Sequence, residues 1–454
     1  MTTAKVLLPH QIEDAAFLAS KSFAGNFSGM GSGKTLTALE AYNKVVNRLN
    51  ANGPHVLLIV GPPISLTMWK DEFEEFFTAS IAQIVKTGKV PLDDTADAYI
   101  MSYEIATKRV AELKALGAKV LICDESHALK TPTAKRTHAI LGAGGLCESV
   151  DHAWMLSGTP STKYNDDLYS FLARADEEGL KQRIGGTTLE RFQLRYCVTQ
   201  KRRFSKYQRV PTIVTVGNRN TEELNAMLFD GGLAVRRELA DVWAQMPPIT
   251  INRLQVALDA DAELKQRLKA MENQTLTQIQ KDLAAKEEHL ATTRRLLGEA
   301  KVKHSVKEII DRVEAGIKPI LVGAWHTNVI DALKAALLTK GLDVGVIDGR
   351  TGPAARTAYI ECFNGGGLDV LVGQLGAMGV SLNLQGGSHI IVVEEDFSPA
   401  VMDQFYARCH RIGQADHVHV DIFESDTQLD KAIRRIVANK RRGHDTLMDQ
   451  GDET

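Results

Sequence analysis

Short apolar runs alternate with helical stretches in two separate parts of the chain. In the first part the runs occupy residues 55–60, 98–101, 119–122 and 153–156, and each precedes a turn or a polar residue. From about residue 301 the alternation resumes, with runs at residues 319–322, 344–347, 369–372 and 389–393. Runs of this length, separated by helix-forming stretches, are typical of buried parallel strands joined by helices. The pattern therefore predicts an α/β protein with two parallel sheets flanked by helices.

The residues between these two parts follow a different pattern. Residues 258–303 combine high helix propensity with dense charge, and they contain neither Gly nor Pro until Gly298. Their apolar spacing is irregular, so we expect exposed, protruding helices and not a sustained coiled coil. The predicted domains are residues 1–178, a helical insertion at residues 179–300, and residues 301–454, which end in a basic helix.

The composition narrows the class of protein. The chain has 454 residues, of which 44% are hydrophobic, so it can bury two or three domain cores. Its five cysteines show no C-x-x-C spacing, which argues against a disulfide framework or a zinc ribbon and for a reducing compartment. The sequence contains no signal peptide and no apolar run of membrane length, so we expect a soluble intracellular protein.

A glycine-rich segment, Ser28 to Thr35, predicts a nucleotide site. In such a turn, backbone N–H groups converge on phosphates, Lys34 reaches the terminal phosphates, and the Thr35 hydroxyl ligates Mg²⁺. A helix is predicted to begin here, and its N-terminus also favours an anion. The alternative is a glycine turn with a chance lysine. The segment therefore points to ATP and Mg²⁺ held by Gly29, Gly31, Ser32, Gly33, Lys34 and Thr35.

Two carboxylates follow the predicted strand at residues 119–123. Asp124 and Glu125 would lie at the C-terminal edge of a parallel sheet, where ligands bind. Asp124 would hold Mg²⁺, and Glu125 would orient or deprotonate the attacking water. Alone, an acidic pair after a strand is more often an ordinary polar turn. Together with Lys34 and Thr35, it predicts the second half of a nucleotide site.

A third candidate lies near the C-terminus, in the segment from Gln404 to Gln414. Arg408 and Arg411 are three residues apart and Gln404 is four residues before the first, so we expect all three side chains on one helix. Two permanent cations on one face suit phosphate, although a solvated basic helix would have the same pattern. The second α/β part has no phosphate loop of its own, so the sequence predicts ATP bound between two lobes.

Two basic clusters interrupt an otherwise balanced charge. The chain has a net charge of −2, yet residues 201–209 and 434–442 are rich in Lys and Arg. Phe204 and Tyr207 are interleaved in the first cluster. Such clusters could neutralise nucleic-acid phosphates while the aromatic rings stack on bases, but they could equally be a solvated loop and a solvated helix end.

These residues, taken in order, resemble the SNF2 family of superfamily 2 DNA translocases over nearly the whole length. In the first half, residues 8–11 resemble the glutamine motif, residues 30–35 motif I, residues 124–127 motif II, and residues 157–160 motif III. In the second half, Asp348, Arg356 and Phe363 match the family's IDG…R…F run, residues 379–384 resemble motif V, and the Gln404–Gln414 segment resembles motif VI. Scattered residues, including Arg236-Arg237, resemble the annealing-helicase branch.

The resemblance implies two RecA-like lobes and a role for each matching residue. Gln11 would read adenine, Arg408 and Arg411 would act as arginine fingers, and Gln404 would position the γ-phosphate or water. By similarity to the DNA-contacting motifs, Ser65, Trp69 and Ser102 in the first lobe and Asn383 in the second are DNA-binding candidates. Trp69 is more often a core aromatic than a base-stacking residue.

The expected function is an ATP-driven translocase on duplex or forked DNA, and the resemblance to the annealing-helicase branch implies an annealing helicase. Two alternatives stay open: a strand-separating helicase or restriction-type motor subunit of the same superfamily, and a catalytically silent DNA clamp. We expect a monomer without a membrane partner, in the cytoplasm of a bacterial cell or of a virus-infected bacterial host.

Overall fold

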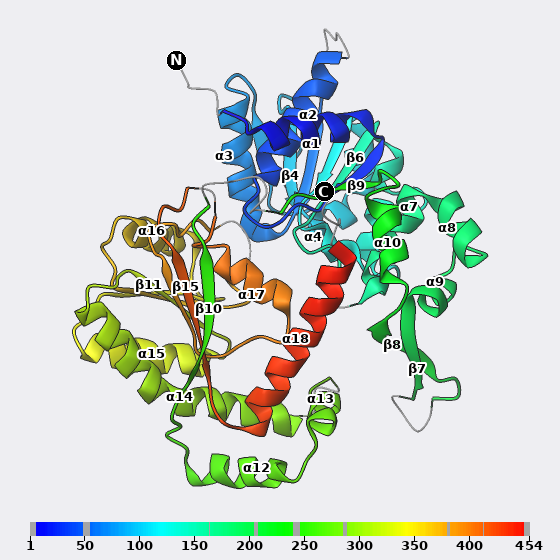
Figure 1. Ribbon diagram of the computed structural model, residues 1–454. Helices are drawn as coiled ribbons and strands as arrows, with labels where there is room; N and C mark the ends of the chain where they lie inside the picture. The colour runs from blue at the N-terminus through cyan, green and yellow to red at the C-terminus, as the bar shows by residue number, and fades with distance from the viewer. Residues whose placement is uncertain are drawn as a thin grey trace. The chain divides into compact units, whose positions relative to one another are not determined.

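The structure is a computed structural model that describes residues 6–48, 55–162, 164–203, 208–238, 246–284, 288–378, 382–411 and 413–448. It divides the chain into two units: Met1–Val242 together with Arg442–Thr454, and Trp243–Arg441. Each unit contains one parallel β-sheet with helices on its faces (Figure 1). The predicted fold class, α/β with two parallel sheets flanked by helices, is confirmed.

The first unit is built on a seven-stranded sheet. Its strands, in spatial order, are β3 (Ala82–Val85), β4 (Ala98–Ser102), β2 (Leu57–Gly61), β5 (Val120–Cys123), β6 (His152–Leu156), β1 (Phe23–Asn26) and β9 (Ala234–Val235). All neighbouring pairs are parallel. The four strands predicted in this region are present, whereas the short strands β1, β3 and β9 were not predicted.

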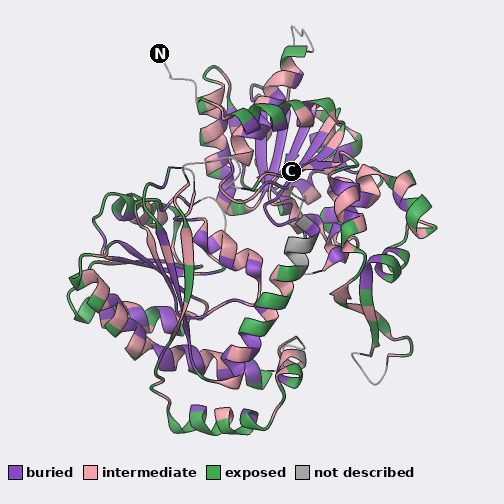
Figure 2. Ribbon diagram, viewed as in Figure 1, coloured by how far each residue is buried: buried purple, intermediate pink, exposed green. Residues whose placement is uncertain are grey.

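Both faces of this sheet are buried, as a parallel sheet requires. Alternate residues of β2 enter different cores: Leu57 and Ile59 pack with the helices α1 (Pro9–Ser20), α2 (Lys34–Arg48) and α3 (Leu66–Phe76). Leu58 and Val60 pack on the opposite face. That face is covered by helices including α4 (Tyr103–Lys108), α5 (Val110–Ala115), α6 (Lys135–Leu141) and α7 (Tyr169–Ala175). Figure 2 shows the strands of this sheet buried.

The second unit contains a six-stranded sheet in which every neighbouring pair is parallel. Its strands, in spatial order, are β10 (Ile249–Gln255), β15 (Val418–Glu424), β14 (His389–Val392), β11 (Ile320–Ala324), β13 (Val370–Gln374) and β12 (Val344–Ile347). One face packs on α16 (Pro353–Asn364) and α17 (Pro399–Tyr406), and the other on α14 (Glu288–Glu314) and α15 (Thr327–Thr339). The four strands predicted here are present, and β10 and β15 are additional.

The helices of residues 258–303 belong to the second unit. They are α12 (Ala262–Glu272), α13 (Leu276–Ala284) and the first part of α14. Leu264, Ile279 and Leu290 are buried in one cluster with Leu429 and Ile433 of α18 (Gln428–Met448). The expectation of exposed, protruding helices is therefore wrong for their apolar side, because α18, distant in sequence, covers it.

The residues predicted as one helical insertion, 179–300, are distributed over both units. The helices α8 (Glu177–Ile184), α9 (Leu189–Tyr196) and α10 (Thr221–Leu228) and the strand β9 belong to the first unit. The strand β10 joins the second sheet. A two-stranded antiparallel sheet, β7 (Cys197–Arg202) and β8 (Thr212–Asn218), stands apart from both large sheets. In the described part of the chain, no helix has the length and apolarity needed to cross a membrane.

Candidate nucleotide-binding site

The glycine-rich segment forms the turn between β1 and α2. Gly31 and Gly33 both have a φ of 80°, in the left-handed region that glycine adopts without a steric penalty. At Gly33, an added Cβ would lie 2.2 Å from Nε2 of Gln11. A larger residue at this position would therefore have to displace the Gln11 side chain. The helix α2 begins directly after, at Lys34, so its N-terminal N–H groups face the turn. The predicted phosphate loop has the backbone that this chemistry requires.

Lys34 lies against the turn that precedes it. Its ammonium donates to the carbonyl oxygens of Ser28 at 2.8 Å and Gly29 at 2.9 Å. Burial lowers the pKa of Lys34 to about 8, although the charges of Glu125 and Asp124 act in the opposite direction. Ser32 is buried, and its hydroxyl has no hydrogen-bond partner within the described residues. A half-buried ammonium and a buried hydroxyl without a partner, both from this loop, fit an anionic phosphate group.

Asp124 lies where β5 ends. Its carboxylate accepts hydrogen bonds from Nε1 of Trp69 at 2.8 Å and from the backbone N–H of Glu125 at 3.0 Å. Burial raises the pKa of Asp124 to about 6, and the neighbouring Glu125 charge also raises it. A buried carboxylate of this kind gains from a nearby cation. The carboxylate and the Thr35 hydroxyl offer the oxygen ligands that Mg²⁺ prefers.

The described residues contain no group of three or more His, Cys, Asp and Glu side chains that could hold a metal ion alone. Mg²⁺ is usually held by one or two carboxylates together with nucleotide phosphates, and Asp124 supplies a carboxylate at this position. The residues at this edge of the first sheet therefore fit ATP and Mg²⁺ as a pair.

Glu125 is linked to the loop that follows β6. It has a φ of 48°, an uncommon left-handed conformation for a residue with a side chain. Its Oε2 lies 3.2 Å from Nδ1 of His127, and the same ring nitrogen lies 3.2 Å from Oγ of Ser157. The Ser157 hydroxyl in turn accepts the N–H of Thr159 at 3.1 Å. Glu125 is therefore connected to Ser157 and Thr159 through His127.

Gln11 contacts the phosphate loop directly. It is buried, its Oε1 accepts the N–H of Leu8 at 2.8 Å, and its Nε2 donates to the carbonyl of Gly33 at 3.3 Å. The structure therefore places this predicted site residue beside the loop, although recognition of adenine stays a prediction.

The sequence did not predict that β9 and the two arginines directly after it support the phosphate loop. The N–H of Gly29 donates to the carbonyl of Arg237 at 2.8 Å, and the N–H of Arg237 donates to Oγ of Ser28 at 3.1 Å. The Arg236 guanidinium donates to the carbonyl of Phe27 at 3.0 Å, and Arg237 also pairs with the buried Asp14 at 3.0 Å. Because β9 is only two residues long, it has no hydrophobic periodicity that could have revealed it.

The predicted helix across Gln404, Arg408 and Arg411 is wrong, because α17 ends at Tyr406. Arg408 and Arg411 lie in the turns that follow, and Nη1 of each lies near the carbonyl of Leu382, at 3.5 and 3.3 Å. The carbonyl of Arg408 accepts the N–H of Leu384 at 2.9 Å. The backbone N–H groups of Arg408 and His410 keep local acceptors, Phe405 and Tyr406, whereas the carbonyl of Arg408 has a long-range partner. The two guanidinium groups still lie together, whereas Gln404 is half-buried on α17.

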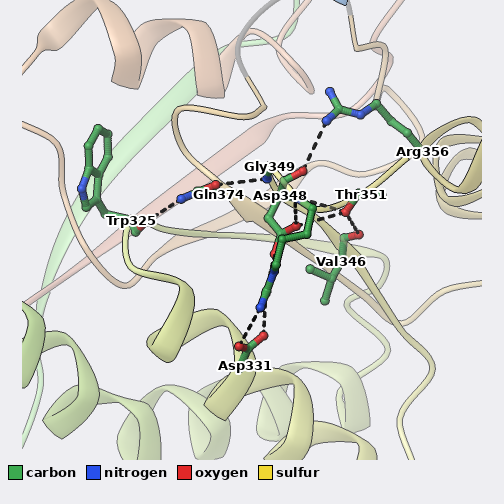
Figure 3. Close-up of polar contacts among 9 residues, drawn as sticks. Trp325, Asp331, Val346, Asp348, Gly349, Thr351, Arg356 and Gln374 are labelled. Carbon is green, nitrogen blue, oxygen red and sulfur yellow. Dashed lines mark hydrogen bonds and ion pairs between the residues drawn. The ribbon is translucent and has the colours of Figure 1, made fainter. Parts of the chain in front are cut away.

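The run that matches IDG…R…F ties together strand ends of the second sheet. Figure 3 shows Gln374 donating to the carbonyl of Trp325 at 3.1 Å and accepting the N–H of Gly349 at 3.2 Å. The carbonyl of Asp348 accepts from Arg356 at 3.4 Å, and its carboxylate accepts the Arg350 N–H at 2.8 Å. These residues therefore position the loops after β11, β12 and β13.

The comparison with known families agrees with this geometry. The model of the SNF2-related domain matches residues 26–302, more than half of the chain. The chain belongs to the SNF2 family. A second model, the helicase conserved C-terminal domain, matches residues 301–413 and so covers most of the second unit. The resemblance predicted from the motifs is confirmed.

SNF2-family relatives match almost the full length of this chain. A Caenorhabditis elegans homolog of SWI/SNF-related matrix-associated actin-dependent regulator of chromatin subfamily A-like protein 1 is 28% identical over 96% of this chain and 61% of its own length. The Xenopus laevis protein is 27% identical, over 96% and 43%. The human "DNA annealing helicase and endonuclease ZRANB3" is 25% identical, over 88% and 36%. The chain thus spans about half the length of the curated relatives it matches, and they include the annealing-helicase branch.

A solved structure also matches, the Sulfolobus solfataricus SWI2/SNF2 ATPase core in complex with dsDNA. It shares 18% identity with this chain, covers 99% of this chain and 94% of its own, and superposes with a TM-score of 0.44.

The predicted localisation is wrong. The matching relatives of this SNF2-family chain come from nematode, frog and human, and the names of the first two refer to chromatin. These relatives are eukaryotic, whereas the sequence alone suggested a bacterial cell or a virus-infected bacterial host.

The four DNA-binding candidates have different surroundings in the structure. Ser65 and Trp69 are completely buried, and Trp69 supports Asp124, so the structure does not favour direct DNA contact by either. The Ser102 hydroxyl caps α4 by accepting the N–H of Ile105 at 3.3 Å. Asn383 is half-buried, and its Oδ1 accepts the N–H of Gln385 at 3.3 Å. The preceding motif V residues, 379–381, lie outside the described residues.

Proposed function

We propose that this chain is an ATP-dependent translocase that moves on duplex or forked DNA. The observation that supports it is the first-unit site, in which Lys34, Thr35, Asp124 and Glu125 meet at one sheet edge in a chain of the SNF2 family. The name of the human relative, a DNA annealing helicase and endonuclease, supports DNA as the substrate.

Each residue of the site has a proposed role. Lys34 binds the β- and γ-phosphates, Thr35 and Asp124 hold Mg²⁺, and Gln11 contacts adenine, while the N–H groups of Met30, Gly31 and Gly33 bind phosphate oxygens. The N–H of Gly29 has a different partner, the carbonyl of Arg237. Bound ATP would supply the phosphoanhydride bond, and Mg²⁺ would neutralise part of the phosphate charge. Glu125 accepts a proton from the attacking water.

The second unit is proposed to contribute the remaining positive charge. Arg408 and Arg411 stabilise the charge that develops on the transferred phosphoryl group, and Gln404 orients that group or the water. Cations of this kind typically accelerate related phosphoryl-transfer reactions by about 10³–10⁵. The two guanidinium groups share the carbonyl of Leu382, so they are positioned as a pair.

The phosphate-release rate, measured with no DNA, single-stranded DNA, duplex and fork, tests this proposal. We expect duplex or forked DNA to raise the rate and Lys34→Ala to abolish the increase, because the substitution removes the phosphate-binding ammonium. Substitution of the exposed Lys108, also in the first unit, by Ala is the control and should leave the rate unchanged. Equal rates with and without DNA would contradict a motor and favour a silent clamp.

A displacement assay on a tailed duplex separates the remaining functions. Annealing without strand separation is expected for the annealing-helicase branch. Robust unwinding without annealing would favour a strand-separating helicase. We also propose that the active species is a monomer, which light scattering of the purified protein in the presence and absence of duplex would test.

A further inference from the structure

One segment of the first unit has a charge unlike that of the rest of the chain. Residues 191–221 contain no Asp or Glu, although the whole chain has a net charge of −2. The same residues include eight basic side chains: Arg191, Arg195, Lys201, Arg202, Arg203, Lys206, Arg209 and Arg219. A segment with this composition attracts a polyanion locally, whatever the net charge of the protein.

The middle of this segment contains the two strands of the β7–β8 ribbon. The two strands pair in antiparallel fashion, from Cys197 opposite Asn218 to Arg202 opposite Thr212. The ribbon belongs to neither large sheet, and Figure 1 shows it extending away from the sheet of the first unit. Figure 2 shows most of its surface exposed or half-buried. The interleaved residues Phe204, Lys206 and Tyr207 lie outside the described part of the chain.

The root of the ribbon is held rigidly by one buried asparagine. The Asn165 side chain, which is completely buried, donates to the carbonyls of Tyr196 at 3.0 Å and Arg219 at 3.1 Å and to the Thr221 hydroxyl at 3.2 Å. Its backbone N–H donates to Oδ1 of Asn218 at 3.0 Å. Asn165 thus contacts the chain at both ends of the ribbon, immediately before β7 and at the end of β8. A structured base of this kind distinguishes the ribbon from a solvated loop.

The basic side chains along the ribbon differ in their partners. Near the root, Arg195 pairs with Glu223 at 2.7 Å. Farther out, Lys201, Arg203 and Arg209 are exposed, and no carboxylate pairs with them among the residues that the structure describes. Exposed cations without counter-charges are available to neutralise the phosphates of a polyanion.

The second basic cluster, near the C-terminus, is used within the protein. Lys440 donates to the carbonyl of Phe397 at 2.7 Å, Arg434 pairs with Glu424 at 3.5 Å, and Arg441 pairs with Asp403. The sequence left both clusters equally open to DNA binding or to a structural role. The contacts of the two clusters differ. Of the two, only the ribbon cluster has several exposed cations that pair with no carboxylate among the described residues.

We propose that the β7–β8 ribbon is a DNA-binding surface that contacts the sugar–phosphate backbone of a duplex arm, separate from the contacts at the sheet edges. Lys201, Arg203 and Arg209 would neutralise phosphates, and the two-stranded shape suits the major groove, which admits such a ribbon. Strands of six and seven residues give a length of about 20 Å, enough to follow several phosphates. The inference rests on the proposed action on DNA, and it adds where a duplex arm is held.

The salt dependence of duplex binding tests the ribbon. Lys201, Arg203 and Arg209 are replaced together by Gln, and a matched variant replaces three exposed cations elsewhere, Lys265, Lys269 and Arg435. Binding of a labelled duplex is measured by fluorescence anisotropy over a range of KCl concentrations, without nucleotide. Because three phosphate contacts are lost, the slope of log K against log [KCl] should become shallower by about 2.7, and binding at low salt should weaken by roughly 10- to 100-fold.

The possible results separate this inference from the proposed function. Retained ATP-analogue binding and an unchanged Tm show that the ribbon variant is folded, and the matched variant should keep the wild-type slope. If the wild type binds duplex and the ribbon variant has the same affinity and slope, the ribbon inference is overturned while the proposed function stands. A loss confined to single-stranded DNA also overturns it. If the wild type itself binds no DNA, the proposed function fails.

Discussion

In each unit a parallel strand leads into a helix, but different charged groups lie at the two strand–helix junctions. In the first unit, β1 leads to α2 through a glycine-rich turn with the half-buried ammonium of Lys34 at its centre. In the second unit, β11 leads to α15 through Trp325 and His326, whose N–H groups both donate to Oε2 of Glu394 at 2.9 Å. The second junction thus binds a carboxylate of the protein itself.

This difference indicates why only one unit is expected to take up nucleotide phosphate. The N-terminus of a helix favours an anion, and in the second unit the buried Glu394 already supplies one. Gly298 of α14 permits this arrangement, because an added Cβ there would lie 2.4 Å from Oε1 of Glu394. The second unit instead offers cations, Arg408 and Arg411, at another loop. One unit is suited to bind phosphate and the other to add positive charge.

The largest expected effect comes from removing a cation of the second unit. Arg411→Ala should lower the DNA-stimulated turnover by about 10³-fold or more, because charge on the transferred phosphoryl group loses a stabilising partner. ATP affinity should change little, since the first unit holds most of the nucleotide. Single-turnover hydrolysis and equilibrium binding of an ATP analogue measure the two quantities, with Arg435→Ala as an exposed control. Unchanged turnover would remove Arg411 from the site.

A slightly smaller effect is expected from a first-unit carboxylate. Glu125→Gln should reduce turnover by about 10²–10⁴-fold because it removes the general base, while ATP still binds. The measurement is phosphate release together with retention of labelled ATP. Glu104→Gln, at an exposed position of α4, is the control. Loss of ATP binding in Glu125→Gln would indicate a structural role through His127 in place of the catalytic one.

The contact between Glu394 and the β11–α15 junction can be tested by a separate substitution. Glu394→Ala leaves the N–H groups of Trp325 and His326 without their acceptor, so we expect the free energy of unfolding to fall by about 2–4 kcal/mol. Urea denaturation followed by circular dichroism measures the change, with the exposed Glu361→Ala as control. ATP-analogue affinity should not increase. A gain of a second nucleotide site would show that Glu394 alone keeps phosphate out of this unit.

The smallest expected effect concerns stability at the first site. The pKa of Asp124 is raised from 3.8 to about 6, so the contribution of this group to stability is complete below about pH 4 and is lost as the pH rises through about 6. Asp124→Asn cannot ionise and should therefore raise the Tm by a few degrees at neutral pH but not in acid. Thermal unfolding without Mg²⁺ checks this, with Asp94→Asn as the exposed control. A lower Tm of Asp124→Asn at neutral pH would contradict the expectation that the ionised Asp124 carboxylate lowers stability.

Local signals in the sequence were sufficient for the strands and for much of the first site. Eight apolar runs became strands of the two sheets, because a strand buried on both faces must be apolar throughout. The glycines at 31 and 33 and the acidic pair after β5 were equally visible, because this chemistry depends on residue type and close spacing. These features depend on neighbouring residues in the sequence and not on contacts with distant parts of the chain.

Contacts between distant residues were decided only by the tertiary structure. The helix α17 ends at Tyr406, and just beyond that end the carbonyl of Arg408 accepts the N–H of Leu384, a residue distant in sequence. The support of the phosphate loop by Arg237 and the hold of Asn165 on the ribbon join segments far apart in sequence. Hydrogen bonds of this kind leave no periodic pattern, since each uses a single residue. The sequence alone thus determined which groups are available for chemistry, and folding decided which of them are held in place.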